Sequence, residues 1–176
     1  MNLVSNYQRT NLTRLAVCAV AVLISFHGIA FGQIVTIGDL NQTYNGTDDP
    51  WELGSELLIV GETAEGILLI FGGSVVNDSQ ATLGQNAGVV GEATVSGAGS
   101  QWNHAGGTFT VGSNGEAILN IDMGGRITGF RTQVGRNTNG QGTVTLTNGA
   151  EWIHTEDLRL ASSTNSMATL LSLIHI

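Results

Sequence analysis

Two short motifs in the sequence combine residue types that can bind ligands: a tryptophan followed two positions later by a histidine. They are Trp102 with His104, and Trp152 with His154. An exposed tryptophan ring can stack on a sugar, and a neutral imidazole can bind a metal ion. These four residues are therefore candidate ligand contacts, forming either a carbohydrate-stacking strip or a weak metal site.

The alternative interpretation of the same motifs is structural. Each tryptophan would close a corner of the backbone, with its histidine exposed beside it. If the motifs lie two stacked coils apart, their imidazoles are roughly 10 Å apart, because neighbouring strands are spaced by about 4.8 Å. A zinc ion needs its nitrogen ligands at about 2.0–2.1 Å, so the two histidines cannot share one ion. The spacing favours the structural interpretation, and the sequence predicts no metal site and no cofactor.

Acidic residues gather in two places, namely Asp48, Asp49 and Glu52, and Glu151, Glu156 and Asp157. Calcium takes oxygen ligands of this kind from loops. Neither group has the spacing of an EF-hand loop, and the Gly-Gly-x-Gly-x-Asp repeat of calcium-binding β-rolls does not occur. We expect a solvated acidic surface at both places.

The sequence carries no pattern typical of an active site. Its repeated strands hold no pair of carboxyl groups such as a glycosidase needs, and no base beside the cations that a polysaccharide lyase uses. It has no Gly-x-Ser-x-Gly elbow, no phosphate loop and no zinc-binding helix. We expect a protein without enzymatic activity, although the β-helix scaffold does host carbohydrate-active enzymes.

The elements that must position these residues form a repeat of about fifty residues. An aliphatic residue followed by glycine recurs at spacings of 23, 28 and 23, at Val60-Gly61, Leu83-Gly84, Val111-Gly112 and Val134-Gly135. The repeat region 58–170 then divides into the units 58–108 and 109–157 and a partial unit, 158–170. Segments such as 143–147 alternate apolar and hydroxyl residues, which is typical of a strand with one inward face.

A coil of 23 to 28 residues with strands this short cannot bury its own apolar face. It must stack on a neighbour about 4.8 Å away. The sequence therefore predicts an all-β fold, a parallel β-helix or β-solenoid of about five coils. A sandwich of antiparallel hairpins is the alternative, because Asn-Gly also marks tight hairpin turns. The period, which stays near 51, favours the solenoid.

Two stretches of the repeat carry a resemblance to known proteins. They are Val-Gly-x-x-Gly-x-x-x-Leu-x-Ile-x-x-Gly-Gly-x-Ile from Val111 to Ile127, and GEATVSGAGSQW from Gly91 to Trp102. Both are similar to the repeat shared by autotransporter passengers and by exported proteins with a C-terminal PEP-type sorting signal. The likeness covers roughly Leu58 to Leu170. It implies a parallel β-helix at the cell surface, usually without an assigned biochemical function.

The first 32 residues resemble an export signal. Arg9 and Arg14 precede the apolar run Leu15–Ile24, and the small-x-small site Ala30–Gly32 predicts cleavage before Gln33. An apolar run of about ten residues is short of the roughly twenty that span a bilayer. We expect a cleaved signal peptide and a mature chain without a membrane span.

The two ends of the repeat region differ from its middle. Residues 33–57 predict a first strand and a capping loop, which a solenoid needs because an open strand edge invites aggregation. Residues 171–176 resemble a truncated or artefactual terminus. The last coil has no polar cap in the sequence, which would allow end-to-end self-association.

The overall charge narrows the range of partners. Six basic residues, all arginine, face 14 acidic ones, giving a net charge of −8 and a pI near 4.7. No basic stripe can neutralise phosphates, so we expect no nucleic-acid partner. The content of 25 glycines with one proline excludes collagen.

Together these observations predict an exported, non-enzymatic, structural or adhesin-like solenoid. Its expected place is extracellular or on the surface of a bacterium, in association with the outer membrane, with a surface or matrix polysaccharide as its partner. One alternative is a glycan-binding module that uses Trp102 and Trp152. Another is the N-terminal fragment of a β-helix carbohydrate-active enzyme.

Overall fold

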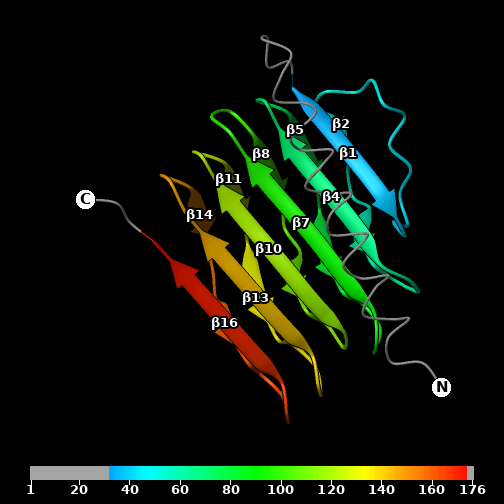
Figure 1. Ribbon diagram of the computed structural model, residues 1–176, viewed down its shortest axis with the longest axis vertical. Helices are drawn as coiled ribbons and strands as arrows, with labels where there is room; N and C mark the ends of the chain where they lie inside the picture. Colours follow the sequence, from blue (N-terminus) through cyan, green and yellow to red (C-terminus); the bar gives the residue numbers. More distant parts are fainter. Residues whose placement is uncertain (1–31, 174–176) are drawn as a thin grey trace, which may run out of the picture. The chain divides into compact units, whose positions relative to one another are not determined.

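The structure is a computed structural model that describes residues 32–173, and within them the chain forms sixteen strands and no helix. The predicted export signal, apart from Gly32, lies outside the described residues, as do the last three residues of the chain. The described part is a stack of coils in which strands from successive coils lie side by side (Figure 1).

Three sheets run along the stack, and each takes one strand from every coil. Sheet A contains, in spatial order, β4 (Gly66–Phe71), β7 (Val90–Ser96), β10 (Glu116–Asp122), β13 (Gln141–Leu146) and β16 (Met167–Ser172). Sheet B contains β3 (Leu57–Val60), β6 (Gln80–Leu83), β9 (Thr108–Val111), β12 (Arg131–Val134) and β15 (Leu158–Leu160). Sheet C contains β2 (Trp51–Glu52), β5 (Val75–Asp78), β8 (Gln101–His104), β11 (Arg126–Gly129) and β14 (Glu151–His154).

The chain passes through sheets C, B and A in turn, five times, and all coil-to-coil pairings are parallel. We number the coils 1 to 5, from β2–β3–β4 to β14–β15–β16. The predicted β-solenoid of about five coils is confirmed, and the antiparallel sandwich is excluded. The aliphatic residues that revealed the repeat form one ladder in sheet B, listed by coil as Val60, Leu83, Val111, Val134 and Leu160.

The glycine that follows the ladder residue in coils 1 to 4 turns the chain out of sheet B. Gly84 has a φ of 62°, and a Cβ atom there would lie against the backbone oxygen of Glu116 in the next coil. Coil 5 carries Ala161 at this position, with a φ of 49°. A side chain in the left-handed region costs about 1–2 kcal/mol, so the turn explains why glycine recurs here.

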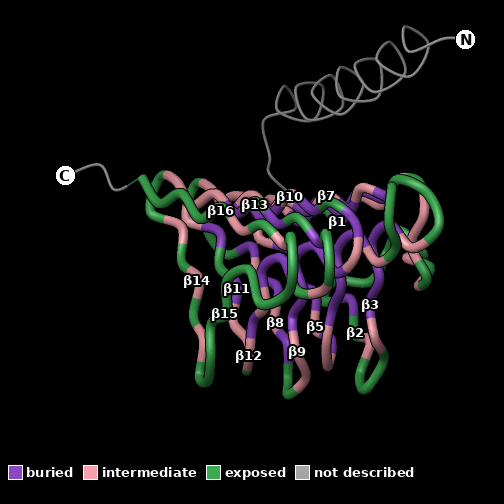
Figure 2. The backbone as a smooth tube through the Cα atoms, turned by 90° about the horizontal axis from the view of Figure 1, so that it is seen from below, coloured by how far each residue is buried: buried purple, intermediate pink, exposed green. Residues whose placement is uncertain are grey.

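The core lies inside the coils because alternate side chains of each strand point inward. Along β7 and β10, buried and partly exposed residues alternate without exception. Buried positions are frequent in coils 1 to 3, whereas the residues of β14 and β15 are intermediate or exposed (Figure 2). The apolar interior is therefore continuous from coil to coil but uncovered at coil 5.

Inward side chains alternate in size from one coil to the next. The ladder in sheet C reads Trp51, Val76, Trp102, Ile127, Trp152. A ladder in sheet B reads Leu58, Ala81, Phe109, Thr132, Leu158. A ladder in sheet A reads Leu68, Ala93, Leu119, Val144, Leu170. Coils 1, 3 and 5 are large-type coils in these ladders, and coils 2 and 4 are small-type coils.

This alternation explains why the sequence repeats after about fifty residues rather than after one coil. Protein interiors are packed as densely as organic crystals, so bulky side chains in one layer need smaller ones in the layers above and below. Two inward ladders do not alternate in this way. In the one that begins at Val60, Leu83 in coil 2 is larger than Val111 in coil 3, and in the one that begins at Ile70, Leu146 in coil 4 is larger than Ser172 in coil 5. The repeat unit is therefore a pair of coils, one of each type.

The N-terminal edge of the stack is closed by residues that precede coil 1. Strand β1 (Gln33–Gly38) pairs antiparallel with β4 at the edge of sheet A. At the edge of sheet B, the side chain of Asn41 imitates a strand: its Oδ1 accepts from Ile59 N at 2.6 Å and its Nδ2 donates to Leu57 O at 2.8 Å. Both edges are thus paired.

Two further residues near the N-terminal edge are Asp39, which precedes coil 1, and Trp51. The Asp39 carboxylate accepts hydrogen bonds from the backbone of Thr63, Ala64 and Glu62, which lower its pKa. The tryptophan, Trp51, is buried and already belongs to coil 1, because β2 pairs with β5. The solenoid therefore begins before Leu58, where the sequence placed the start of the repeats.

Size alternation predicts that enlarging a small-type coil destabilises the fold. Ala93 lies between Leu68 and Leu119 and is buried, so Ala93→Leu should lower the free energy of unfolding by about 1–3 kcal/mol through overpacking. Thr94→Leu, at the adjacent outward position of the same strand, should cost much less. Chemical unfolding measures both, and equal losses would contradict the alternation.

Candidate functional site

The two Trp-x-His motifs occupy matching positions two coils apart. Trp102 pairs with Ile127 in coil 4, and Ile127 pairs with Trp152 in coil 5. The predicted stacking of the two tryptophans is thus confirmed, with one aliphatic residue between them. Trp51 continues the same ladder through Val76, although it lies in the segment 33–57 that the sequence predicts to be a first strand and a capping loop.

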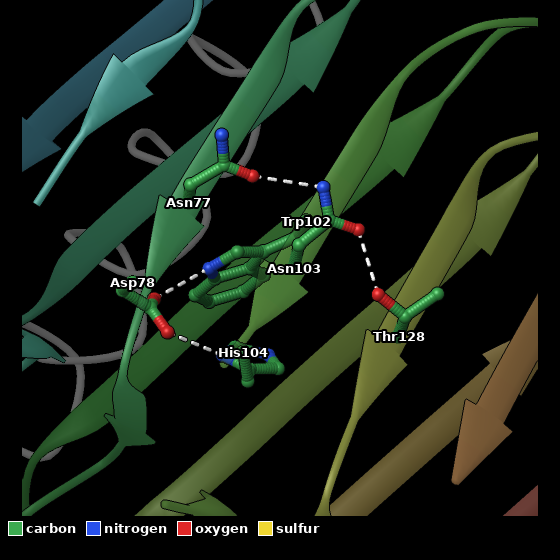
Figure 3. A network of polar contacts seen from close by, with 6 residues as sticks. All are labelled: Asn77, Asp78, Trp102, Asn103, His104 and Thr128. Carbon is green, nitrogen blue, oxygen red and sulfur yellow. Dashed lines mark hydrogen bonds and ion pairs between the residues drawn. The ribbon is translucent and has the colours of Figure 1, made fainter. Parts of the chain in front are cut away.

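The interior of coils 2 and 3 contains a polar network centred on Asp78 (Figure 3). The indole Nε1 of Trp102 donates to Asp78 Oδ2 at 2.7 Å. The other carboxylate oxygen, Oδ1, lies 2.6 Å from Nδ1 of His104. Asp78 and His104 are register partners on β5 and β8, so one carboxylate binds both polar groups of the motif in the next coil.

All three residues are buried, with exposed fractions of 0% for Trp102, 2% for Asp78 and 5% for His104. The expectation that histidine lies exposed beside the tryptophan is therefore wrong for His104. His104 can be buried because the carboxylate of Asp78 forms a hydrogen bond with its imidazole. Without such a partner, burial of a polar ring in an apolar coil would be unfavourable. Trp102 and His104 present no surface on which a sugar could stack.

The Asp78–His104 pair resembles the orienting half of a catalytic dyad, but its surroundings do not suit catalysis. The second ring nitrogen, Nε2 of His104, is buried and has no hydrogen-bond partner. The imidazole stacks on Phe109 at 4.4 Å between ring centroids, and Trp102 lies 5.0 Å from the same ring. A general base must come within hydrogen-bonding distance of a substrate proton, and here an aromatic cluster covers it. We interpret the network as a structural device.

The second motif lies at the uncovered end of the stack. Trp152 and His154 are both half-buried, and their rings meet edge to face at 4.7 Å. His154 Nδ1 lies 3.1 Å from Thr132 Oγ1 of coil 4. Partial burial lowers the pKa of His154 below its ordinary value of 6.5, because desolvation disfavours the imidazolium. Gly129, its register partner, separates His154 from His104, so the two imidazoles do not share a site.

A polar ladder runs along the outside of sheet C, at the residues between the inward ones. Asn77 Nδ2 donates to Glu52 Oε1 at 2.7 Å, and Asn103 Nδ2 donates to Asn77 Oδ1 at 2.8 Å. Thr128 Oγ1 then donates to Asn103 Oδ1 at 2.7 Å. The ladder connects four coils (Figure 3 shows three of its members), so coils 1 to 4 are joined to one another by side chains as well as by backbone.

The two acidic groups of the sequence serve as hydrogen-bond and ion-pair partners. Asp49 Oδ1 accepts from the backbone N of Val75 at 2.9 Å. Asp157 lies 2.8 Å from Arg159, and Glu151 lies 3.5 Å from Arg126. Among residues 32–173, no three His, Cys, Asp or Glu side chains come together in a way that could hold a metal ion.

Sequence reasoning missed Asp78, although a signal for it exists. Asp78 follows Val76 by two positions, as His104 follows Trp102, and β5 alternates in burial like β8. Once the coil length is known, this places Asp78 inside the coil beneath His104. A lone buried carboxylate is unfavourable, and the motif above it supplies the compensating donors.

Comparison with protein-family models, with curated proteins and with solved structures finds no match for this chain. Within the described residues no helix has the length and apolar character needed to cross a membrane.

Removal of the Asp78 carboxylate should destabilise the fold. Asp78→Ala leaves two buried donors without an acceptor, at about 1–3 kcal/mol each, and Asp78→Asn should cost less because its amide oxygen still accepts one bond. Val75→Thr, at an outward position of the same strand, is the matched control with a small effect, because it leaves the carboxylate and its two donors in place. Chemical unfolding and the NMR resonance of the Trp102 indole N–H measure these changes. A native-like resonance in Asp78→Ala would contradict the network.

The lowered pKa of His154 predicts a pH dependence of stability. Its folded-state pKa lies below the unfolded value, so its contribution is complete above pH 6.5 and is lost as the pH falls through the folded pKa. The free energy of unfolding should decrease from pH 7 to pH 5. His154→Gln should reduce this slope relative to the parent chain, and an unchanged slope would assign the dependence to other groups.

Proposed function

We propose that this chain is an exported, non-enzymatic structural module of a bacterial surface or extracellular matrix, a solenoid of the adhesin-like kind. In this role the stacked coils supply length and rigidity, and their outward side chains meet solvent or a surface polysaccharide. Residues 1–32, with the features of a cleavable signal, support export. The repeat's resemblance to those of autotransporter passengers and PEP-type exported proteins supports a surface location.

The observation that carries the proposal is that the side chains best suited to catalysis or sugar binding are buried inside the coils and bonded to one another. Asp78, Trp102 and His104 satisfy one another in the core. A catalytic or carbohydrate-stacking role needs such groups at a surface that a substrate can reach. Their burial favours a structural role over an enzyme, and also over a glycan-binding module that uses Trp102.

The outer face of sheet A is the surface that we propose for polysaccharide contact. Two of its outward ladders carry polar side chains in coils 2 to 4, listed by coil as Thr94, Asn120, Thr145 and as Ser96, Asp122, Thr147. In the first of them, coils 1 and 5 carry Leu69 and Leu171 instead. Repeated polar side chains spaced by about 4.8 Å can hydrogen-bond to successive sugar hydroxyls. Because the chain carries a net charge of −8, a neutral glycan fits this face better than an anionic one.

Export is tested by expressing the full chain with a C-terminal tag in a Gram-negative bacterium. We expect the product outside the cytoplasm with Gln33 as its first residue. The variant Val22→Arg interrupts the apolar run and should leave unprocessed protein in the cytoplasm. Unprocessed parent protein in the cytoplasm would refute the export part of the proposal.

A further inference from the structure

The predicted cleavage site lies at the start of the folded solenoid. Gly32, the last residue of the predicted export signal, directly precedes β1. Gln33, the expected first residue of the mature chain, begins β1 and pairs with Phe71 of β4. Every strand of the structure lies within residues 33–172. Cleavage before Gln33 therefore leaves the fold complete and places a new α-amino group at its N-terminal edge.

Gly32 occupies a narrow space between two polar side chains. A Cβ atom built on it would lie 2.5 Å from Asp49 Oδ2 and 2.6 Å from Ser74 Oγ. Because a carbon–carbon bond is about 1.5 Å long, both oxygens are no more than about 4 Å from the Cα atom of Gly32. The N atom of Gln33 is two covalent bonds further along the chain, so it lies within about 7 Å of both oxygens.

Both oxygens have unused hydrogen-bonding capacity. Asp49 Oδ1 accepts from Val75 N at 2.9 Å, whereas Asp49 Oδ2 has no hydrogen-bond partner among residues 32–173. Ser74 is completely buried, and its Oγ also has no partner in the part of the chain that the structure describes. A buried hydroxyl without a partner is unfavourable. An ammonium group has only donors, and this space offers it a carboxylate oxygen and a hydroxyl oxygen.

The charge of this part of the chain is complementary to an ammonium group. Residues 33–125 contain eleven aspartate and glutamate residues and no lysine or arginine. The negative charge near Gly32 also acts on Tyr44, whose pKa is raised by partial burial and, to a smaller extent, by Asp49 and Asp48. After cleavage, the α-ammonium group of Gln33 is the one fixed positive charge in residues 33–125.

We propose that cleavage before Gln33 creates an ion pair between its α-ammonium group and Asp49, with Ser74 Oγ as a second hydrogen-bond acceptor. Hydrolysis of the peptide bond gives Gly32 a carboxylate and Gln33 an α-amino group, which takes up a proton at pH 7 because its ordinary pKa is about 7.7–8.0. The ion pair fixes the start of β1 to the loop before coil 1 and to the turn between β4 and β5. Cleavage thereby completes the N-terminal cap. This inference rests on the proposed export, because it requires cleavage at this bond.

The absence of lysine makes the test specific, because the α-amino group is the only primary amine of the mature chain. The chain 33–176, which contains every strand, is released from an N-terminal fusion by a protease that leaves Gln33 as the first residue. The α-amino group is methylated at once with ¹³C-labelled formaldehyde and a reducing agent. The NMR resonance of the methyl groups, followed against pH, gives the pKa of this amine in the folded chain and in the chain unfolded by urea.

We expect a pKa about one unit higher in the folded chain than in the unfolded chain, because a nearby carboxylate favours the ammonium form. Asp49→Asn should remove most of this difference, although its amide oxygen can still accept from Val75 N. Ser74→Ala should remove part of it. The matched control is Asp48→Asn, which removes the same charge one residue away, from a carboxylate that binds Asn45, and it should change the pKa little.

Equal pKa values in the folded and unfolded chain would overturn the inference, as would equal decreases in Asp49→Asn and Asp48→Asn. If Asp49→Asn lacks the β-type circular dichroism of the parent chain, Ser74→Ala decides, and an unchanged pKa in that variant would overturn the inference. Release from the fusion does not depend on export. Unprocessed protein in the export experiment therefore refutes the proposed function, whereas the pKa measurements test the ion pair alone.

Discussion

Backbone pairing holds neighbouring coils about 4.8 Å apart, and this fixed spacing decides which side chains can face one another. Every inward residue lies directly above and below residues of the adjacent coils, so a bulky layer needs a less bulky layer on each side. In this chain the requirement is met by alternating large-type and small-type coils, with Trp102 between Val76 and Ile127 as the clearest case. The sequence repeats after about fifty residues because one large-type coil and one small-type coil together form the repeat unit.

The polar network inside coils 2 and 3 follows from the same geometry. The strand register places Asp78 directly beneath His104. The indole N–H of Trp102 donates a hydrogen bond to the same carboxylate. Burial of such groups costs free energy unless each is paired, so the network ties together the identities of three residues in two coils. Aspartate, tryptophan and histidine suggest a catalytic or binding site when only the sequence is considered. In this structure their hydrogen bonds hold coil 3 on coil 2.

The sequence was sufficient to predict the coils but not what they contain. Glycine after each aliphatic ladder residue, and alternation in strands such as 143–147, are local signals, and they gave the parallel solenoid and the stacking of Trp102 on the same column as Trp152. Burial of His104 was not predicted because it depends on Asp78, which is distant in sequence and carries no motif of its own. The place of Trp51 in coil 1 was not predicted, because the polar loop before it does not match the repeat and the start of coil 1 is not recognisable in the sequence.

Contacts around Ile127 test the stacking of large on small coils most directly. Nuclear Overhauser effects should connect the Ile127 methyl groups to the indole protons of both Trp102 and Trp152, since it is the register partner of each. No direct effect should connect the two indoles, which lie two coils apart. Indole-to-indole contacts, or an Ile127 side chain close to neither ring, would contradict this account of the fold.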